Sequence, residues 1–333
     1  MKLKAGIIGL GVGEAHIAGY QSHSNCEVKA VCDLSQARLR EVQKKFSIPK
    51  VSTDANEILE DPEIDMVSVA SYDNLHHDQV IKALEHDKHV FVEKPLCLYE
   101  EEASRIRTLL KSKPSLKLSS NLILRQSPRF RRLKKMVEAG EFGTLFYLEG
   151  DYHYGRLHKL TDGWRGKLDF YSVVYGGSVH LVDLLLWLSS DAVEEVFAYG
   201  NQIASKGSEF RHHDCVAALL KFRSGLIGKV TADFGGVRPH FHGLSLYGTK
   251  ASFENSLPHG RLFRSREPNQ APEPVLEAYP GVEKGDLIHQ FVDSVLNGKT
   301  GEVSVEDVFK TMSVCFAIEK SAKEGRPVPV RYL

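Results

Sequence analysis

Two short motifs carry side chains that can do acid–base chemistry. The first is Glu93-Lys94-Pro95, which follows an apolar run of β-branched and aromatic residues at 90–92. That run predicts a buried strand, and proline ends it because proline has no amide hydrogen for the sheet ladder. In an open parallel sheet, ligands bind beyond the carboxyl ends of the strands, so we expect the Lys94 ammonium beside a bound cofactor. A solvated strand end is the alternative for the tripeptide taken alone.

The second motif is His180-x-x-Asp183, within a long apolar stretch that predicts a buried helix over residues 175–188. Residues three apart share a helix face, so Asp183 can orient the His180 imidazole and support its charged form. The other ring nitrogen would then exchange a proton with a substrate. We therefore predict Lys94, His180 and Asp183 as the catalytic residues.

The first third of the chain alternates strand and helix patterns, as expected for a parallel sheet with helices on its faces. The predicted strands occupy residues 5–9, 27–32, 66–70, 89–92 and 117–121. The predicted helices between them occupy residues 14–21, 35–46, 55–60, 76–85 and 99–111. This α/β pattern predicts a first domain, residues 1–122, with a Rossmann-type, doubly wound parallel sheet.

A glycine-rich turn, Gly9-Leu10-Gly11-Val12-Gly13, joins the first predicted strand to the first predicted helix. Its glycines permit a tight turn in which backbone amides approach a pyrophosphate, although position 14 is glutamate where G-x-G-x-x-G has glycine. Asp33 ends the second strand, where a carboxylate accepts bonds from a ribose diol and repels a 2′-phosphate, so NAD is favoured over NADP. The other predicted cofactor contacts are Arg38, Ser71, Asn74, His77, Glu93 and Lys94.

Composition restricts the class of partner and the cellular compartment. The 333 residues include 43 Lys and Arg against 43 Asp and Glu, so no overall field attracts nucleic acid or an anionic membrane. No stretch is apolar enough to span a membrane. The five cysteines form no C-x-x-C pair, which argues against a disulfide framework or structural zinc and favours a reducing, cytoplasmic setting. We expect a small-molecule substrate.

The second predicted domain, residues 123–333, has α+β patterns with a large, mostly antiparallel open sheet. Predicted strands cover residues 144–152, 213–222, 226–234, 244–247 and 251–254. One predicted helix begins at Pro128, and two more cover residues 286–296 and 304–323. Residues 255–285 predict a long loop that serves as a lid or a subunit arm, or is merely ordered by the surface. The basic run 129–135 predicts a solvated helix face. One sheet face is left to cover, so we expect a homodimer or homotetramer through this sheet.

Residues 151–166 are rich in groups that stack on or hydrogen-bond a polyol. A polar connecting loop is the alternative for this stretch. The predicted substrate-binding residues are Lys94, Asn121, Tyr154, Trp164, Arg165 and His180. No set of histidines has convincing ligand spacing, so we predict no metal site.

The glycine turn, Asp33, Asn74-x-x-His77 and the V-F-V-E-K-P-L segment together resemble the Gfo/Idh/MocA oxidoreductases, the family of glucose–fructose oxidoreductase and inositol dehydrogenase. The resemblance covers nearly the whole chain. It implies hydride transfer between nicotinamide and a secondary alcohol of a sugar, cyclitol or sugar derivative. It also implies that Lys94 lies beside the nicotinamide and the substrate hydroxyl, and that the Lys94–Pro95 bond is cis.

The chain departs from the family pattern just before His180. The pattern has an aspartate four residues before the histidine and a glycine two before it, whereas this chain has Gly176 and Ser178. Two alternatives to a dehydrogenase stay open, the second of them because of this missing aspartate. One is an enzyme that recycles NAD during a net non-redox reaction such as glycosidic cleavage, and the other is an NAD-binding ligand sensor without turnover.

Overall fold

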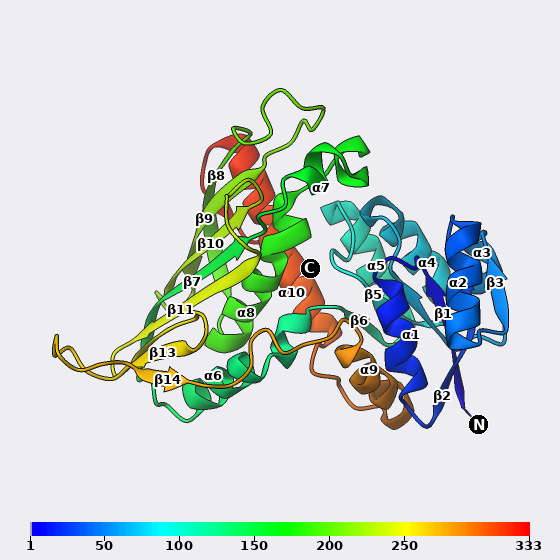
Figure 1. The fold of residues 1–333 in the computed structure, drawn as a ribbon, viewed down its shortest axis with the longest axis horizontal. Coiled ribbons are helices and arrows are strands. Elements are labelled where there is room, and N and C mark those ends of the chain that lie inside the picture. The colour runs from blue at the N-terminus through cyan, green and yellow to red at the C-terminus, as the bar shows by residue number, and fades with distance from the viewer. Residues whose placement is uncertain (1) are drawn as a thin grey trace. The chain divides into compact units, whose positions relative to one another are not determined.

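The structure is a computed structural model that describes residues 2–333. The chain folds into two compact units, coloured along the chain in Figure 1. Unit 1 contains the residues up to Ile123, Val282–Lys310 and Leu333, and unit 2 contains Leu124–Gly281 and Thr311–Tyr332. The predicted division at residue 122 places Val282–Lys310 in the second domain, whereas in the structure the helix in this segment packs with unit 1.

Unit 1 is built on a six-stranded parallel sheet with strand order β3-β2-β1-β4-β5-β6. Its strands are β1 (Leu3–Ile8), β2 (Cys26–Cys32), β3 (Lys50–Ser52), β4 (Met66–Val69), β5 (His89–Val92) and β6 (Leu118–Ser120). Its helices are α1 (Gly13–Gln21), α2 (Gln36–Phe46), α3 (Asn56–Leu59), α4 (His76–Glu85), α5 (Glu100–Ser112) and α9 (Asp286–Asn297). This strand order is that of a dinucleotide-binding sheet, with its topological switch point between β1 and β4, so the predicted fold class is confirmed.

The central strands of unit 1 are apolar on both faces because helices cover both faces of the sheet (Figure 1). Ile7, Val67 and Phe91 are fully buried, and α1 packs against α9 while α4 packs against α5. The edge strand β3 was not predicted, since three residues are too few to show a period of two.

Unit 2 contains a nine-stranded sheet with strand order β14-β13-β12-β11-β7-β10-β9-β8-β15. The strands are β7 (Leu145–His153), β8 (Val193–Asn201), β9 (Cys215–Phe222), β10 (Ile227–Asp233), β11 (Phe241–Gly248), β12 (Ser252–Glu254), β13 (Gly260–Phe263), β14 (Glu273–Val275) and β15 (Val328–Pro329). Only the β7–β10 pair is parallel among the described strand pairs of this sheet, which confirms the predicted antiparallel character.

Helices line one face of the unit 2 sheet, where α8 packs on β7 and β10. The helices here are α6 (Pro128–Glu138), α7 (His158–Thr161), α8 (Val179–Ser189) and α10 (Val305–Glu324), which enters unit 2 at Thr311. The strands alternate buried and accessible residues, as β11 does along its whole length. One face of the sheet is therefore core and the other is accessible.

Three parts of unit 2 differ from the sequence predictions. Residues 255–285 are not a continuous loop, because β13 and β14 form within them despite the prolines. The strands β8 and β15 were also unpredicted. The helix expected over residues 175–188 begins as a π-helical turn, Val174–Ser178, that runs into α8.

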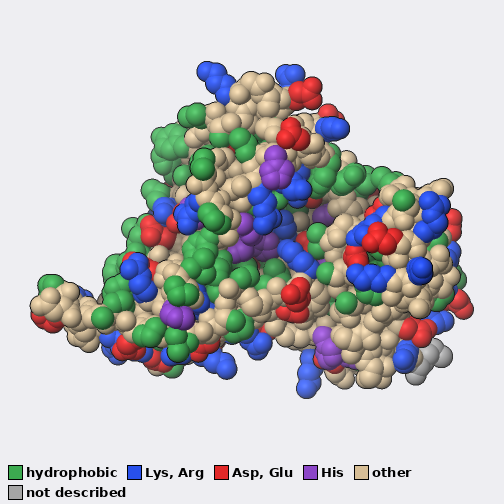
Figure 2. Space-filling model, in the orientation of Figure 1, with side chains coloured by type: hydrophobic (Ala, Val, Ile, Leu, Met, Phe, Trp, Pro, Cys, Tyr) green, Lys and Arg blue, Asp and Glu red, His purple; other side chains and the backbone are tan. Residues whose placement is uncertain are grey.

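The surface charge is mixed and the cysteines are unpaired. Basic and acidic side chains are interspersed on the face shown in Figure 2. All five cysteines in the described chain are free thiols. None of the helices formed by residues 2–333 is long and apolar enough to cross a membrane.

Candidate active site

The glycine turn after β1 needs glycine at different positions for different reasons. Gly9 has φ +88°, and a Cβ there would overlap the Ala70 carbonyl and lie 2.7 Å from the Ser71 nitrogen. Gly13 opens α1, and a Cβ there would lie 2.8 Å from Ile7 on β1. A Cβ on Gly11 would meet no atom within 4 Å. The turn therefore packs tightly at both ends and is open in its middle, next to the helix N-terminus where an anion is stabilised.

Asp33 holds this turn from the end of β2. Its Oδ2 accepts the Leu10 amide at 2.8 Å, and its Oδ1 accepts the Ser35 amide at 2.8 Å. Each carboxylate oxygen has further lone pairs for a ligand hydroxyl. The predicted ribose contact stays a prediction, and the structure adds that Asp33 shapes the glycine turn.

Arg38 is held by carboxylates. Its guanidinium contacts Glu14, and its Nη1 donates to Glu41 at 2.7 Å. Glu14 occupies the position at which the G-x-G-x-x-G pattern has glycine, and Lys45 also pairs with it at 2.8 Å. The positive charge of Arg38 is therefore compensated, which leaves it poorly suited to clamp a 2′-phosphate.

Polar side chains follow β4, on the segment that leads into α4. Asn74 is exposed on the 3-10 turn Asp73–Leu75, and the Ser71 hydroxyl donates to Gln79 at 2.7 Å. His77 is 9% exposed; its Nδ1 lies 2.7 Å from an Asp78 oxygen, while its buried Nε2 has no partner among the described residues. A buried polar atom without a partner is costly, so Nε2 is placed to bind a ligand.

His76 belongs to the scaffold. It is fully buried, and its Nδ1 donates to the Pro95 carbonyl at 2.6 Å. Its Nε2 lies 3.3 Å from the Ser71 carbonyl. The imidazole therefore ties the segment after β4 to the segment after β5, where the Lys94–Pro95 bond is cis as the resemblance implied.

Glu93, next to the half-buried Lys94, is the centre of a buried polar network. The Asn121 amide donates to Glu93 Oε1 at 2.6 Å, and His16 Nε2 lies 3.3 Å from the same oxygen. Burial would raise the pKa of Glu93, but the His16 hydrogen bond and the charges of Lys284 and Lys94 hold it well below its usual range. A carboxylate anion therefore stands beside the Lys94 ammonium.

The structure differs from the sequence predictions at two members of this network. Asn121, predicted to bind substrate, is fully buried and also donates to the Lys284 carbonyl at 3.0 Å. Its Oδ1 is buried without a partner in the described chain and so can still accept a ligand bond. His16 was not predicted; its Nδ1 lies 3.3 Å from the Ser68 hydroxyl, and the available signal was its place one turn after Gly13.

In unit 2, Asp183 forms an ion pair with a residue that the sequence analysis did not identify. Arg125 donates to Asp183 from Nε at 2.9 Å and from Nη2 at 2.6 Å. The Thr311 hydroxyl lies 3.4 Å from the same carboxylate, and both charged side chains are almost fully buried. The predicted orientation of His180 by Asp183 stays a prediction, and the structure adds that Arg125 fixes the carboxylate.

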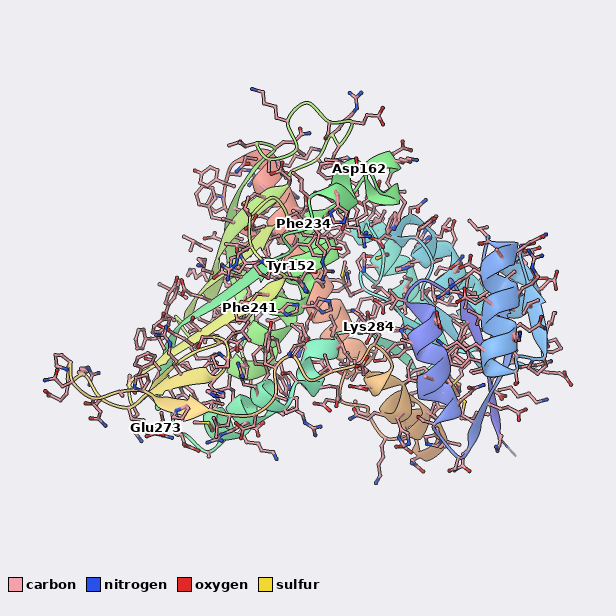
Figure 3. All side chains as sticks on the ribbon, viewed as in Figure 1. Tyr152, Asp162, Phe234, Phe241, Glu273 and Lys284 are labelled. Atoms are coloured by element: carbon pink, nitrogen blue, oxygen red, sulfur yellow. The ribbon has the colours of Figure 1, made fainter. Side chains whose placement is uncertain are left out.

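Aromatic and histidine rings form a continuous cluster beside His180, which is buried on α8. Figure 3 labels two of its members, Tyr152 on β7 and Phe234 just after β10, whose ring centroids are 5.7 Å apart. Tyr154 packs on Phe234 at 4.5 Å, and His242 lies 5.4 Å from Tyr152 and 6.3 Å from His180. All of these rings are buried, so they form a packed aromatic cluster next to His180.

Trp164 and Arg165, both predicted to bind substrate, lie together on a short 3-10 turn. The Arg165 guanidinium carbon is 4.7 Å from the Trp164 ring centroid. Arg165 Nε donates to the Tyr171 hydroxyl at 3.1 Å, and Trp164 meets the Tyr171 ring edge-on at 6.3 Å. The two predicted residues thus share Tyr171, which the sequence interpretation did not include.

Buried Arg129 anchors the segment predicted to be a lid or an arm. It is 1% exposed, so the prediction of a solvated face is wrong at this residue. It donates to the Ser256 carbonyl at 2.9 Å and the Glu277 carbonyl at 3.1 Å. Near the end of this segment, Tyr279 lies 2.8 Å from His242 Nδ1. The segment is therefore connected to the ring cluster.

One group of potential metal ligands lies together among the described residues: His23, His289 and Asp293. His23 Nε2 lies 3.2 Å from Asp293, and His23 Nδ1 accepts the Asn25 amide at 3.1 Å. An imidazole that accepts at Nδ1 carries its proton on Nε2, so here it is a donor to the carboxylate. The geometry describes a hydrogen-bonded pair.

Two family models match the chain. Residues 3–121 match an oxidoreductase family with an NAD-binding Rossmann fold, GFO_IDH_MocA, and residues 130–254 match the GFO/IDH/MocA C-terminal domain. The myo-inositol 2-dehydrogenase of Thermotoga maritima is 27% identical over 98% of each chain, and the NAD⁺-dependent scyllo-inositol 2-dehydrogenase of Bacillus subtilis is 26% identical over 98% of this chain and 96% of its own. A levoglucosan dehydrogenase structure with NADH superposes over all of both chains with a TM-score of 0.88 at 22% identity, which supports the fold.

Proposed function

The chain belongs to the GFO/IDH/MocA oxidoreductases, and from this premise we propose that it transfers hydride reversibly between NAD and a secondary alcohol of a cyclitol or sugar. The observation that carries the proposal is the row of polar groups at the carboxyl ends of five parallel strands, which includes an open glycine turn and two buried atoms without partners. The names of the inositol dehydrogenase relatives favour a cyclitol.

Unit 1 has the groups that NAD needs. The open amides around Gly11 would receive the pyrophosphate, and Asp33 would accept the adenosine ribose hydroxyls. The charge of Arg38 is already compensated by Glu14, which supports NAD over NADP. His77 Nε2 and Asn121 Oδ1 would complete the polar contacts. Bound NAD supplies the carbon that accepts the hydride.

The protein's own residues would bind the alcohol and move its proton. Lys94, whose neighbours in the chain are the Glu93 carboxylate and Pro95, would hold the reacting hydroxyl and, as the neutral amine, take its proton as the hydride leaves. His180 would relay the proton, with Asp183 held in place by Arg125. Tyr154, Trp164 and Arg165 would orient the ring.

The test is nicotinamide reduction by the purified protein, with NAD and NADP in parallel, across inositols, sugars, sugar acids and nucleotide sugars. We expect activity with NAD on a cyclitol or sugar. Lys94→Met should lower kcat at least about 100-fold, the typical contribution of a general base. The matched control is Lys111→Met, an exposed lysine on α5.

Two results would overturn the dehydrogenase. Substrate cleavage without net cofactor reduction would identify an enzyme that recycles NAD. Tight NAD binding without hydride exchange on any compound would identify a ligand sensor. Full turnover by Lys94→Met would remove Lys94 from the mechanism and leave the reaction class standing.

The accessible face of the unit 2 sheet supports a homodimer or homotetramer. Its strands expose Tyr199, Leu219 and Ile227, with exposed fractions of 66%, 53% and 51%. Hydrophobic side chains also lie along the left-hand margin of Figure 2, where the strands of unit 2 lie in Figure 1. An apolar sheet face of this kind is typical of a subunit interface. A monomer by sedimentation at micromolar concentration would contradict this assembly.

A further inference from the structure

Unit 1 contains a cavity that the candidate active site does not use. Its volume is about 370 Å³, within the range of small-molecule sites. Three segments form its walls: residues 114–119, which lead into β6, one face of α9, and residues 299–306, through which the chain returns to α10. The polar groups of the candidate active site instead follow the carboxyl ends of the strands, so this cavity is a separate place in unit 1.

The floor of the cavity is apolar. Leu118, Leu287, Phe291 and Val303 line it, and each is at most 4% exposed. The Phe291 ring also packs on Phe91 of β5, with ring centroids 5.5 Å apart. A floor of this kind contacts the carbon skeleton of a small ligand and keeps water away from its polar groups.

The free edge of β6 adds a backbone amide and a backbone carbonyl to the wall. β6 is the last strand of the sheet; the Val90 amide donates to the Lys117 carbonyl at 2.8 Å, and the Asn121 amide donates to the Val92 carbonyl at 3.1 Å. Because bonding residues alternate along a parallel strand, Leu118 has its amide and carbonyl on the side away from β5. Neither group has a partner among residues 2–333. A buried pair of this kind favours a ligand that both donates and accepts hydrogen bonds.

Gln290 lines the cavity from α9 and has a polar atom without a partner. Its Nε2 donates to Glu302 at 3.2 Å, whereas its Oε1 is buried and unpaired within the described chain. Ser294, one turn further along α9, donates its hydroxyl proton to a backbone carbonyl at 2.7 Å, so its oxygen can only accept. Both side chains therefore suit a ligand with hydroxyl groups.

The charged residues around the cavity leave positive charge uncompensated. Lys117 donates to a backbone carbonyl at 3.2 Å, and Lys299 is exposed; neither forms an ion pair within residues 2–333. Of the two acidic residues on the cavity, Glu306 pairs with Arg107 at 2.7 Å, so the two lysines outweigh Glu302. An anionic group on the ligand would be attracted to the lysines.

From these contacts we infer that the cavity is a second ligand site, which binds a small polyol that carries one carboxylate or phosphate. The carbon skeleton lies on the apolar floor, hydroxyl groups bond to Gln290 Oε1 and to the Leu118 backbone, and the anionic group pairs with Lys117 and Lys299. This site goes beyond the proposed function and does not depend on it, because none of its residues belongs to the candidate active site.

The test is calorimetric titration of the full-length, NADH-bound protein with gluconate and with glucose 6-phosphate, which distinguishes the carboxylate from the phosphate. Glucose and inorganic phosphate are the comparisons, since each lacks one of the two kinds of contact. We expect at least one anionic polyol to bind about tenfold more tightly than both. Lys117→Met should weaken this binding about tenfold, whereas Lys111→Met, which removes the same charge from the exposed surface of α5, should not.

Two further variants test the position of the ligand. A Cβ on Gly301 would lie 3.7 Å from the Gln290 backbone oxygen and 3.8 Å from Ser294 Cβ, which are ordinary contacts with two residues of the cavity. Gly301 has no positive φ, so Gly301→Val fills the cavity without backbone strain and should weaken binding at least about tenfold. Gln290→Met keeps the length of the side chain, removes the acceptor and should also weaken binding about tenfold. Melting temperatures identify any variant that fails to fold, and the other variants then decide.

The outcomes separate this site from the candidate active site. Loss of binding in Gly301→Val with unchanged affinity in Lys94→Met would support the inference, whether or not the protein oxidises a polyol. Loss of binding in Lys94→Met would place the ligand in the candidate active site and overturn it. The inference also fails if neither anionic polyol gives a heat of binding at about 5 mM, or if Gly301→Val and Lys117→Met both keep the affinity within about twofold.

Discussion

The two units hold their functional groups by different means. In unit 1 the groups stand at the ends of neighbouring parallel strands, and backbone atoms position several of them, as the Leu10 and Ser35 amides do for Asp33. In unit 2 the groups come from a π-helical turn, strands and loops, and other side chains position them, as Arg125 does for Asp183. We therefore expect unit 2 to lose stability or ligand binding when a partner side chain is replaced. We expect unit 1 to lose them when a substitution changes the backbone conformation or the space around it.

The largest expected effect is in unit 2. Arg125→Met leaves the Asp183 carboxylate buried without its cation, which should lower the free energy of unfolding by about 3–5 kcal/mol. Urea unfolding followed by tryptophan fluorescence measures this, since Trp164 and Trp187 are the only tryptophans and both lie in unit 2. Arg125→Met/Asp183→Leu should recover most of the loss, because it removes both charges. A single-variant loss below about 1 kcal/mol would show that the pair is not a main support.

Glu319, also in unit 2, should make stability depend on pH. It lies on α10 and accepts a hydrogen bond from the Ser172 hydroxyl; burial raises the pKa of its carboxyl from 4.5 to about 7. The folded state thus binds this proton more tightly than the unfolded chain, so stability falls as pH rises from about 4.5 to about 7. Glu319→Gln cannot ionise, and its stability relative to the wild type should increase by up to about 3 kcal/mol between pH 4.5 and pH 8. A pH-independent difference in urea unfolding would contradict this.

In unit 1 the sensitive positions should be backbone ones. Gly9→Ala requires alanine at φ +88° and a Cβ against the Ala70 carbonyl, so it should cost about 1–3 kcal/mol of stability. Gly11→Ala meets no protein atom and should leave stability unchanged while weakening NAD binding at least about tenfold, because its methyl group would fill the space that we propose for the pyrophosphate. Thermal melts and NADH titration distinguish the two variants. Equal NADH affinity in Gly11→Ala and the wild type would place the cofactor elsewhere.

The same difference between the units explains what could be predicted from the sequence. The glycine turn, Asp33 and the strand at 89–92 are encoded by neighbours in the chain, so periodicity and glycine spacing indicate them. Arg125 and Asp183 are 58 residues apart, and nothing local to either residue indicates the pair. The contact of Tyr171 with Gly176 depends on a π-helical turn that the apolar pattern does not distinguish from an α-helix. The strands β13 and β14 are short and contain or follow prolines, so residues 255–285 showed no period.

The smallest effect tests whether side-chain positioning in unit 2 extends to the segment at 255–285. The Tyr279 oxygen accepts the His242 backbone amide at 2.7 Å and lies 2.8 Å from His242 Nδ1. Tyr279 therefore holds both the backbone and the imidazole of His242 in place. Tyr279→Phe should cost about 1 kcal/mol of stability and raise KM for the polyol a few-fold with little change in kcat, because it affects how His242 is held. Tyr247→Phe, on the accessible side of β11, is the matched control. An unchanged KM in Tyr279→Phe would show that the segment at 255–285 does not affect substrate binding. Arg129 would then anchor that segment for structural reasons alone.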